Sequence, residues 1–306
     1  MARRILITGG AGFIGSNLAG HLTANGDKVY VIDNLSTAAE RHDLFCEEFL
    51  RADLATLERP AKVELMIKYA DVVYHLASSV GVKHVDKDPK HAIRNSFDIN
   101  NRLFPLFEKH HSRVIFASTS EVYGDCTTAK ETDTLRIGPT DTLRWGYACG
   151  KLMSEFLLKS YSFPHTVARF FNVSGRGQVD THGMVLPTFV NRAKADQDLV
   201  VYGTGMQSRS FCDIRDAVEM LELIATEQHV NETYNIGNSD NMITMYNLAQ
   251  LVKDVVGSNS RIVRRDYKQD FSDQHADIHS RRPNTQKMDQ HYKAKYSIEE
   301  MIRDML

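Results

Sequence analysis

"ILITGGAGFIGSNLAGHL", residues 5–22, joins an apolar strand to an amphipathic helix through a cluster of glycines. Gly10, Gly12 and Gly15 have the spacing G-x-G-x-x-G, directly after the predicted strand and at the start of the predicted helix. Glycines in this context permit a tight turn and let the backbone approach a pyrophosphate, while the helix N-terminus supplies unpaired N–H groups. The stretch therefore predicts the strand–turn–helix unit of a dinucleotide-binding fold.

An acidic residue ends the second predicted strand. Asp33 closes "KVYVID" (28–33), roughly 20 positions after the turn, which is where such folds place a carboxylate. A carboxylate there hydrogen-bonds a ribose 2′-hydroxyl and repels a 2′-phosphate. The sequence therefore favours NAD over NADP.

Short Val- and Ile-rich runs alternate with helical patterns through the first half of the chain. Strands are expected at 4–8, 28–33, 47–53, 71–77, 113–119 and 165–172, and helices at 13–25, 57–68, 91–110 and 145–162. This alternation indicates repeated βαβ units. It predicts an α/β protein with a Rossmann-type, doubly wound parallel sheet covered by helices on both faces.

The pattern becomes less regular after Asn172. Helices are expected at 183–195, 214–226 and 244–255, and short strands at 199–203 and 207–212. We expect an NAD-binding domain at 1–172, to which segments around 209–238 return, and a smaller C-terminal α/β domain, mostly 173–306, that binds the substrate.

Composition excludes several other classes of protein. The 306 residues carry a net charge of −2 with Lys and Arg spread along the chain, which is unlike a nucleic-acid footprint. The longest apolar runs are strand-length, and the N-terminus leads into a strand, so neither a membrane span nor a signal segment is expected and the predicted location is cytoplasmic. The four cysteines and thirteen histidines have no ligand spacing, so no metal is expected.

At this point the chain resembles the extended short-chain dehydrogenase/reductases that modify nucleotide sugars. The resemblance is carried by "TGGAGFIG" (8–15), "HLA" (75–77), "STSEVYG" (118–124), Tyr147-x-x-x-Lys151, "RFFN" (169–172), "GMVLP" (183–187), "VYGTGMQSRSF" (201–211) and "NIGN" (235–238). It implies NAD as cofactor and a UDP-sugar as substrate. The cofactor-binding residues that it implies are Gly9, Gly12, Phe13, Ile14, Gly15, Asp33, Asn34, Asp53, Leu54, Leu76, Ala77, Tyr147 and Lys151.

Tyr147 and Lys151 lie four residues apart and so share one face of a predicted helix. An ammonium near a phenol favours the phenolate, so we expect the pKa of Tyr147 to fall from about 10 toward the working range. The spacing alone also fits a solvated helix face. The resemblance implies that Tyr147 is the catalytic base, that Lys151 tunes it and holds the nicotinamide ribose, and that Thr119 orients the substrate hydroxyl.

The two residues after Thr119 bear on the reaction that follows oxidation at C4 of the sugar. Sugar 4,6-dehydratases of this kind carry an Asp-Glu pair there, whereas this chain has Ser120-Glu121, which argues against dehydration. "STSEVYGD" (118–125) is close to UDP-glucuronate decarboxylases, whereas "RWGYACGK" (144–151) and "HLASSVGVKHV" (75–85) look more like epimerases. Glu121 could also be a solvated or capping carboxylate.

Four residues of the second half match substrate-binding positions of the family. Asn172 matches a contact to the substrate diphosphate, Arg209 and Arg281 match arginines that clamp the pyrophosphate, and Tyr202 matches a position near the nucleobase. Arg282 could replace Arg281, and Tyr202 could equally be a core residue. The chain has Pro283-Asn284 where relatives have Pro-Asp.

Three functions are compatible with these residues. The main hypothesis is an NAD-dependent UDP-sugar 4-epimerase acting on a UDP-hexose or UDP-hexuronate. The alternative is UDP-glucuronate decarboxylase or a related dehydratase, with Glu121 and Arg281 acting around the carboxylate, and a third is a non-catalytic NAD-binding regulator. Apolar residues on more than one face of the helices at 91–110 and 145–162 predict a homodimer.

Overall fold

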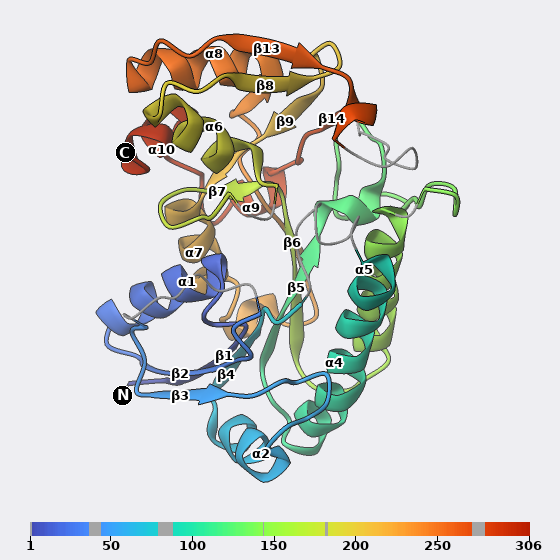
Figure 1. Ribbon diagram of the computed structural model, residues 1–306. Helices are drawn as coiled ribbons and strands as arrows, with labels where there is room; N and C mark the ends of the chain where they lie inside the picture. The colour runs from blue at the N-terminus through green and yellow to red at the C-terminus, as the bar shows by residue number, and fades with distance from the viewer. Residues whose placement is uncertain (1, 37–43, 79–87, 143, 181–182, 271–278) are drawn as a thin grey trace.

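A seven-stranded sheet forms the larger part of the molecule (Figure 1). The computed structural model describes residues 2–36, 44–78, 88–142, 144–180, 183–270 and 279–306. All neighbouring strands of this sheet pair in parallel. In order they are β11 (Thr233–Ile236), β6 (His165–Phe170), β5 (Val114–Thr119), β4 (Val72–His75), β1 (Arg4–Thr8), β2 (Lys28–Asp33) and β3 (Glu48–Arg51).

Helices cover both faces of this sheet, as expected for strands that are apolar on both sides. One face packs against α1 (Phe13–Ala24) and α7 (Ile214–Leu223). The other packs against α2 (Pro60–Tyr69), α4 (Pro89–Lys109) and α5 (Arg144–Lys159) (Figure 1). The prediction of a doubly wound parallel α/β sheet is confirmed.

A second, smaller unit lies beyond the carboxyl ends of the large sheet, at the top of Figure 1. Its separate core lies among α6 (Val185–Lys194), β8 (Leu199–Tyr202), α8 (Met245–Val256) and α10 (Ile298–Asp304). Its other elements are β9 (Ser208–Ser210), β12 (Met242–Thr244), β13 (Ile262–Arg265), η3 (Tyr267–Gln269) and β14 (Ser280–Arg281). The remaining elements are η1 (Ser120–Tyr123), β7 (Val173–Ser174), β10 (Cys212–Asp213), η2 (Glu227–His229) and α9 (Gln286–Asp289), and three of them, β7, β10 and α9, contribute Val173, Cys212 and Met288 to the larger core.

Several element boundaries differ from the pattern read in the sequence. The run 207–212, expected as one strand, divides between β9 and β10, which belong to different sheets. The cause is that the chain crosses here from the smaller unit back to the larger one. The helix expected at 214–226 ends at Leu223, and the strand expected at 47–53 covers only Glu48–Arg51. The domain division at residue 172 stays a prediction, although β11, which comes after it, forms an edge of the large sheet.

No helix within the described ranges is both long enough and apolar enough to cross a membrane.

Candidate active site

The glycine turn lies where β1 ends and α1 begins. Gly9 has φ +71°, a left-handed conformation, and a Cβ added to it would lie 2.8 Å from the backbone nitrogen of Ala77. A Cβ on Gly15 would meet the carbonyl oxygen of Gly9 and lie 2.6 Å from the Cα of Gly10. These approaches exclude any side chain, which explains why the sequence places glycine at these positions.

Asp33 at the end of β2 is attached to this turn. Its Oδ2 accepts a hydrogen bond from the N–H of Ala11 at 3.0 Å, and its Oδ1 accepts from Leu35 at 2.7 Å. Gly12 is the N-cap of α1 and offers no side-chain cap, so the first turn of the helix is open to an anion. A cradle without side chains, an uncapped helix start and an adjacent carboxylate fit the pyrophosphate and ribose of NAD.

The other predicted cofactor residues lie at this same edge of the sheet. Asn34 and Asp53 follow β2 and β3, and their side chains are 3.4 Å apart, from Nδ2 to Oδ2. Leu76 and Ala77 follow β4, and the N–H of Ala77 donates to Thr8 Oγ1 at 3.3 Å. The three remaining residues pack into the cores on either side: Phe13, Ile14 and Leu54.

Thr119, Tyr147 and Lys151 come together between β5 and α5. Tyr147 hydrogen-bonds to the Thr119 side chain. Lys151 is 4% exposed, and its Nζ donates to the carbonyl oxygen of Ala117 at 3.0 Å. The fold therefore brings the three residues of the predicted catalytic group into one place.

The expectation about the pKa of Tyr147 is wrong for this structure. Burial of the phenol raises its pKa, the negative charge of Glu121 raises it further, and only Arg281 and the hydrogen bond from Thr119 act in the other direction. Burial also lowers the pKa of Lys151 to about 8, against a smaller opposing effect of Glu155. Desolvation disfavours the charged form of both groups, so it outweighs the attraction that the i, i+4 spacing suggests.

Glu121 lies on η1 and faces Arg281 of the smaller unit. Arg281 Nη1 is 3.4 Å from Glu121 Oε1, and the Arg281 side chain is almost fully buried. Ser120, beside Glu121, is also buried. Arg282, the competing candidate, is exposed and donates from Nε to the carbonyl oxygen of Ser239. The arginine that meets the catalytic group is therefore Arg281.

Arg209 and Arg281 are register partners in the parallel pair of β9 and β14. Their side chains therefore project from the same face of this small sheet. Such a pair of guanidinium groups fits an anion such as a diphosphate or a carboxylate. Asn172 has φ +38°. Its Nδ2 donates a hydrogen bond to the carbonyl oxygen of Ser210, the residue that follows Arg209.

Tyr202 is the fourth predicted substrate residue. Its ring stacks on Tyr267 with centroids 5.3 Å apart, and its hydroxyl donates to Asp270 Oδ2 at 2.8 Å. The side chain is half-buried at the end of β8. This arrangement leaves both interpretations of Tyr202, nucleobase contact and packing residue, as predictions.

A buried ion pair beneath the catalytic group escaped the sequence analysis. Glu155, four residues after Lys151 on α5, accepts from Arg169 Nε at 3.0 Å and from Nη2 at 2.6 Å. It also accepts from Ser118, which precedes Thr119. The Lys151–Glu155 spacing and the position of Arg169 in "RFFN" were available signals, but their contact needs the packing of α5 on β6.

The fold also assembles a group of potential metal ligands that are distant in sequence. His21, Glu219 and Glu222 hold ligand atoms within 4.8 Å of one another. Glu222 is already bonded to His21 at 2.7 Å and to Arg3 at 2.9 Å. Because a guanidinium already neutralises this carboxylate, we assign no ion to the group.

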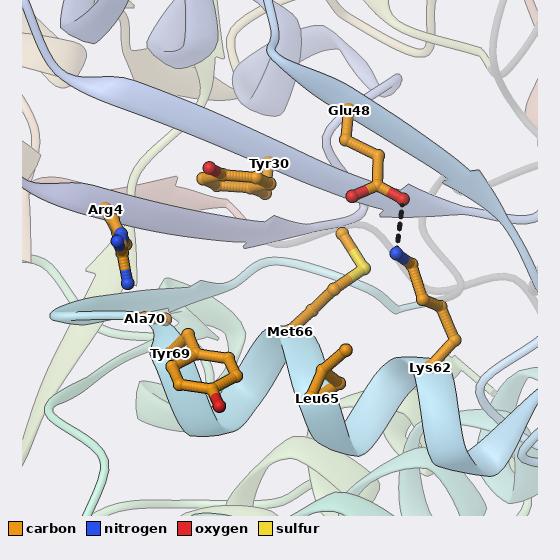
Figure 2. Close-up of a pocket in the computed structure, with 8 residues that line it drawn as sticks. All are labelled: Arg4, Tyr30, Glu48, Lys62, Leu65, Met66, Tyr69 and Ala70. Carbon is orange, nitrogen blue, oxygen red and sulfur yellow. Dashed lines mark ion pairs between the residues drawn. The ribbon is translucent and has the colours of Figure 1, made fainter.

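A pocket of about 170 Å³ lies beside α2, and Figure 2 shows the residues that line it. It lies near the starts of β1 and β3, where Arg4 and Glu48 line it, and a Lys62–Glu48 ion pair of 2.7 Å borders it. Ligands of open α/β sheets bind at the carboxyl ends of the strands. This pocket is therefore separate from the candidate active site.

The fold and the Tyr-Lys site define a dehydrogenase-type protein built on a dinucleotide-binding sheet. The family model described as "NAD dependent epimerase/dehydratase family" matches residues 5–237. The chain belongs to this family, and its cofactor is NAD.

Curated relatives are mostly decarboxylases. The chain is 35% identical over 295 residues to a UDP-N-acetyl-alpha-D-glucosaminuronate decarboxylase of Bacillus cytotoxicus, covering 94% of this chain and 91% of that protein. It is 32% identical over 290 residues to UDP-glucuronic acid decarboxylase 4 of Arabidopsis thaliana, covering 93% of this chain and 63% of the plant protein.

Similar solved structures include epimerases. One is a UDP-N-acetylglucosamine 4-epimerase of Methanobrevibacter ruminantium in complex with UDP-N-acetylmuramic acid. Its TM-score is 0.86 at 26% identity, and 99% of this chain and 97% of that chain are covered.

Proposed function

We propose that this chain is an NAD-dependent decarboxylase of a UDP-uronate, the alternative rather than the main hypothesis of the sequence analysis. The observation that carries the proposal is the ion pair beside Tyr147 between half-buried Glu121 and buried Arg281, with its 3.4 Å separation. The similarity to two UDP-uronate decarboxylases over more than nine tenths of the chain supports it.

In this proposal, each group of residues has one task in binding. The glycine turn and Asp33 hold the pyrophosphate and adenosine ribose of NAD, and Lys151 holds the nicotinamide ribose. Arg209 binds the substrate diphosphate together with Asn172. Arg281, kept in place by Glu121, binds the carboxylate of the uronate, because a guanidinium matches the planar geometry of that group.

The chemistry then requires one proton transfer before the carbon–carbon bond breaks. NAD, when bound, supplies a hydride acceptor for C4, and the positive charge of its oxidised ring favours the phenolate of Tyr147. Tyr147 accepts the proton of the C4 hydroxyl, which Thr119 orients. The oxidised sugar is a β-keto acid, so the C5–C6 bond breaks, its electron pair moves toward the C4 carbonyl, and carbon dioxide leaves. C5 then takes up a proton from water, C4 regains its hydride, and Tyr147 returns the proton to the C4 oxygen, which gives a UDP-pentose.

The proposal is tested by incubating the purified protein and NAD with four substrates separately. These are UDP-glucuronate, UDP-N-acetylglucosaminuronate, UDP-glucose and UDP-N-acetylglucosamine, and products are followed by mass spectrometry and proton NMR. We expect carbon dioxide from a uronate. An unchanged mass with an inverted C4 centre would instead establish the epimerase and overturn the proposal.

Two neighbouring arginines provide a matched pair of variants. Arg281→Gln is expected to lower kcat/KM for carbon dioxide release about 10²- to 10³-fold, since it removes the charged hydrogen bonds that bind and orient the substrate carboxylate. Arg282→Gln changes an exposed side chain and should leave the rate within about twofold. Equal rates for the two variants would refute the assignment of Arg281.

The homodimer and the cytoplasmic location expected from the sequence remain proposals. The exposed apolar side chains of α5, Met153 and Phe156, support the first.

A further inference from the structure

A chain of buried hydrogen bonds crosses the larger unit from the glycine turn to α5. It begins at the N–H of Ala77, which donates to Thr8 Oγ1 at 3.3 Å. Thr8 Oγ1 is 2.7 Å from His75 Nδ1, and His75 Nε2 is 2.9 Å from Asn100 Oδ1. All three side chains are at most 2% exposed.

This hydrogen-bond chain ends on α5, the helix that carries Tyr147 and Lys151. Asn100 Nδ2 donates to Ser154 Oγ at 2.7 Å, and Ser154 Oγ donates to the carbonyl oxygen of Gly150 at 2.8 Å. Gly150 directly precedes Lys151. At the other end, Ala77 packs against Gly9, where NAD is expected to bind. The hydrogen bonds therefore connect the two ends of the cofactor site through β1, β4, α4 and α5.

The groups at the two ends of this hydrogen-bond chain fix the direction in which every hydrogen bond is donated. The Ala77 end is a backbone N–H, which can only donate, and the Gly150 end is a carbonyl oxygen, which can only accept. Every group between them is satisfied in one arrangement, in which the Thr8 hydroxyl donates to His75 Nδ1 and His75 Nε2–H donates to Asn100. This requires a neutral His75 with its proton on Nε2, because an imidazolium would leave the Thr8 hydroxyl without its acceptor.

The surroundings of His75 favour the neutral form. Its ring packs against Phe104, Phe107 and Phe116, with centroids 5.6–6.1 Å away. Lys151 is a nearby positive charge. Burial, with a smaller effect of Lys151, lowers the pKa of His75 to about 4.

We propose that His75, Asn100 and Ser154 are positioning residues that hold α5, and with it Tyr147 and Lys151, in register with the glycine turn. This inference rests on the proposed catalytic roles of Tyr147 and Lys151. It assigns a task to a histidine that lies within "HLA" and that neither binds a substrate nor titrates at neutral pH. A displacement of a catalytic group of about 1 Å can lower a rate about 10²-fold, so such a constraint matters for turnover.

Two variants interrupt this hydrogen-bond chain and leave the core filled. His75→Phe keeps an aromatic ring among three phenylalanines but loses both hydrogen bonds. Ser154→Ala removes the last link and places the best helix former in α5. We expect each to lower kcat about 10- to 100-fold while KM changes less than about threefold, with amide hydrogen exchange of α5 accelerated.

His229→Phe is the matched control. His229 is as buried as His75 and bonds to Tyr234 OH at 2.8 Å, but it lies in η2, before β11 begins. It should lose stability as His75→Phe does while retaining the wild-type kcat and the wild-type hydrogen exchange of α5. If all three variants lose only stability and keep kcat, the positioning role is refuted.

A measurement without substrate tests the direction of the hydrogen bonds that His75 makes. Nitrogen-15 NMR of labelled histidines in the NAD-saturated wild type should find His75 neutral with the proton on Nε2 at pH 7. An imidazolium or a proton on Nδ1 would overturn the proposal. Because this experiment and the hydrogen exchange need no sugar, they test the positioning role even if the wild type releases no carbon dioxide and the proposed function fails.

Discussion

Lys151 is held in an environment that disfavours its charge. Its pKa falls from 10.5 to about 8 because burial removes the ammonium from water. Between these two pH values the unfolded chain binds more protons than the folded one, so stability rises with pH across this window. Below about pH 8 the folded protein carries the full cost of the buried charge. The residue is therefore kept for function rather than for stability.

Replacing this lysine should separate stability from activity. Lys151→Met keeps the length of the side chain and removes the charge. At pH 7 we expect it to be about 1–3 kcal/mol more stable than wild type, after allowing for the lost hydrogen bond to Ala117, and to be inactive. Urea unfolding at pH 7 and pH 10 measures this, and the gain should shrink at pH 10. A variant less stable than wild type at pH 7 would contradict this account.

Individual residues also set how far the site could be predicted. The sequence predicted the roles of Gly9, Gly15 and Asp33, because a close backbone approach and the end of a strand depend on residues that are neighbours in the sequence. The pKa of Tyr147 is not local: it depends on burial and on Glu121 and Arg281, which reach it from two other segments. The spacing along one helix therefore predicted that Tyr147 and Lys151 lie together, but it predicted the wrong direction for the pKa shift of Tyr147.

At the scale of elements, the two glycines of α1, Gly15 and Gly20, differ in whether the structure needs them. A Cβ on Gly15 would collide with the backbone of the preceding turn, whereas a Cβ on Gly20 would meet only the ring of Phe45 at 3.4 Å, an ordinary contact. The first glycine is needed for close packing of the helix on the turn. The second only weakens the helix.

The two substitutions to alanine should therefore differ in sign. Gly20→Ala is expected to stabilise the protein by about 0.5–1 kcal/mol with unchanged NAD affinity. Gly15→Ala should destabilise it by about 1–3 kcal/mol and weaken NAD binding at least about tenfold. Thermal unfolding with and without NAD, together with NAD titration, measures both effects. Equal behaviour of the two variants would show that the turn is not constrained as described.

Element boundaries were predictable to within a few residues where hydrophobic periodicity was strong, as in α1 and β2. They were not predictable at 207–212, because apolar spacing cannot reveal that Phe211 separates strands of two different sheets. Pairing partners decide where such a short strand ends.

At the scale of the whole molecule, α5 presents an apolar surface that its own fold leaves exposed. Met153 is 51% and Phe156 is 70% exposed, and their spacing of three residues places them on one helix face. Their exposure supports the expected homodimer through the helices at 91–110 and 145–162.

A charge on this face should prevent association. Phe156→Glu is expected to yield a monomer at micromolar concentration, because dimerisation would bury the carboxylate, whereas the wild type is expected to elute as a dimer. Phe45→Glu alters a phenylalanine that is 59% exposed beside α1 and should leave the dimer intact. Light scattering after size-exclusion chromatography distinguishes these states. A monomeric wild type would refute the expected assembly.

The sequence by itself determined the parallel α/β sheet, the glycine turn, the NAD preference suggested by Asp33 and the presence of a Tyr-Lys pair. Each of these follows from residues close together in the chain, where periodicity and spacing carry the information. Only the tertiary structure decided that Arg281 rather than Arg282 faces Glu121, that Arg209 lies beside it, and that hydrogen bonds run from Ala77 to Gly150. These contacts join segments far apart in the sequence, and their energies depend on burial, which forms only when the sheet, its helices and the smaller unit pack together.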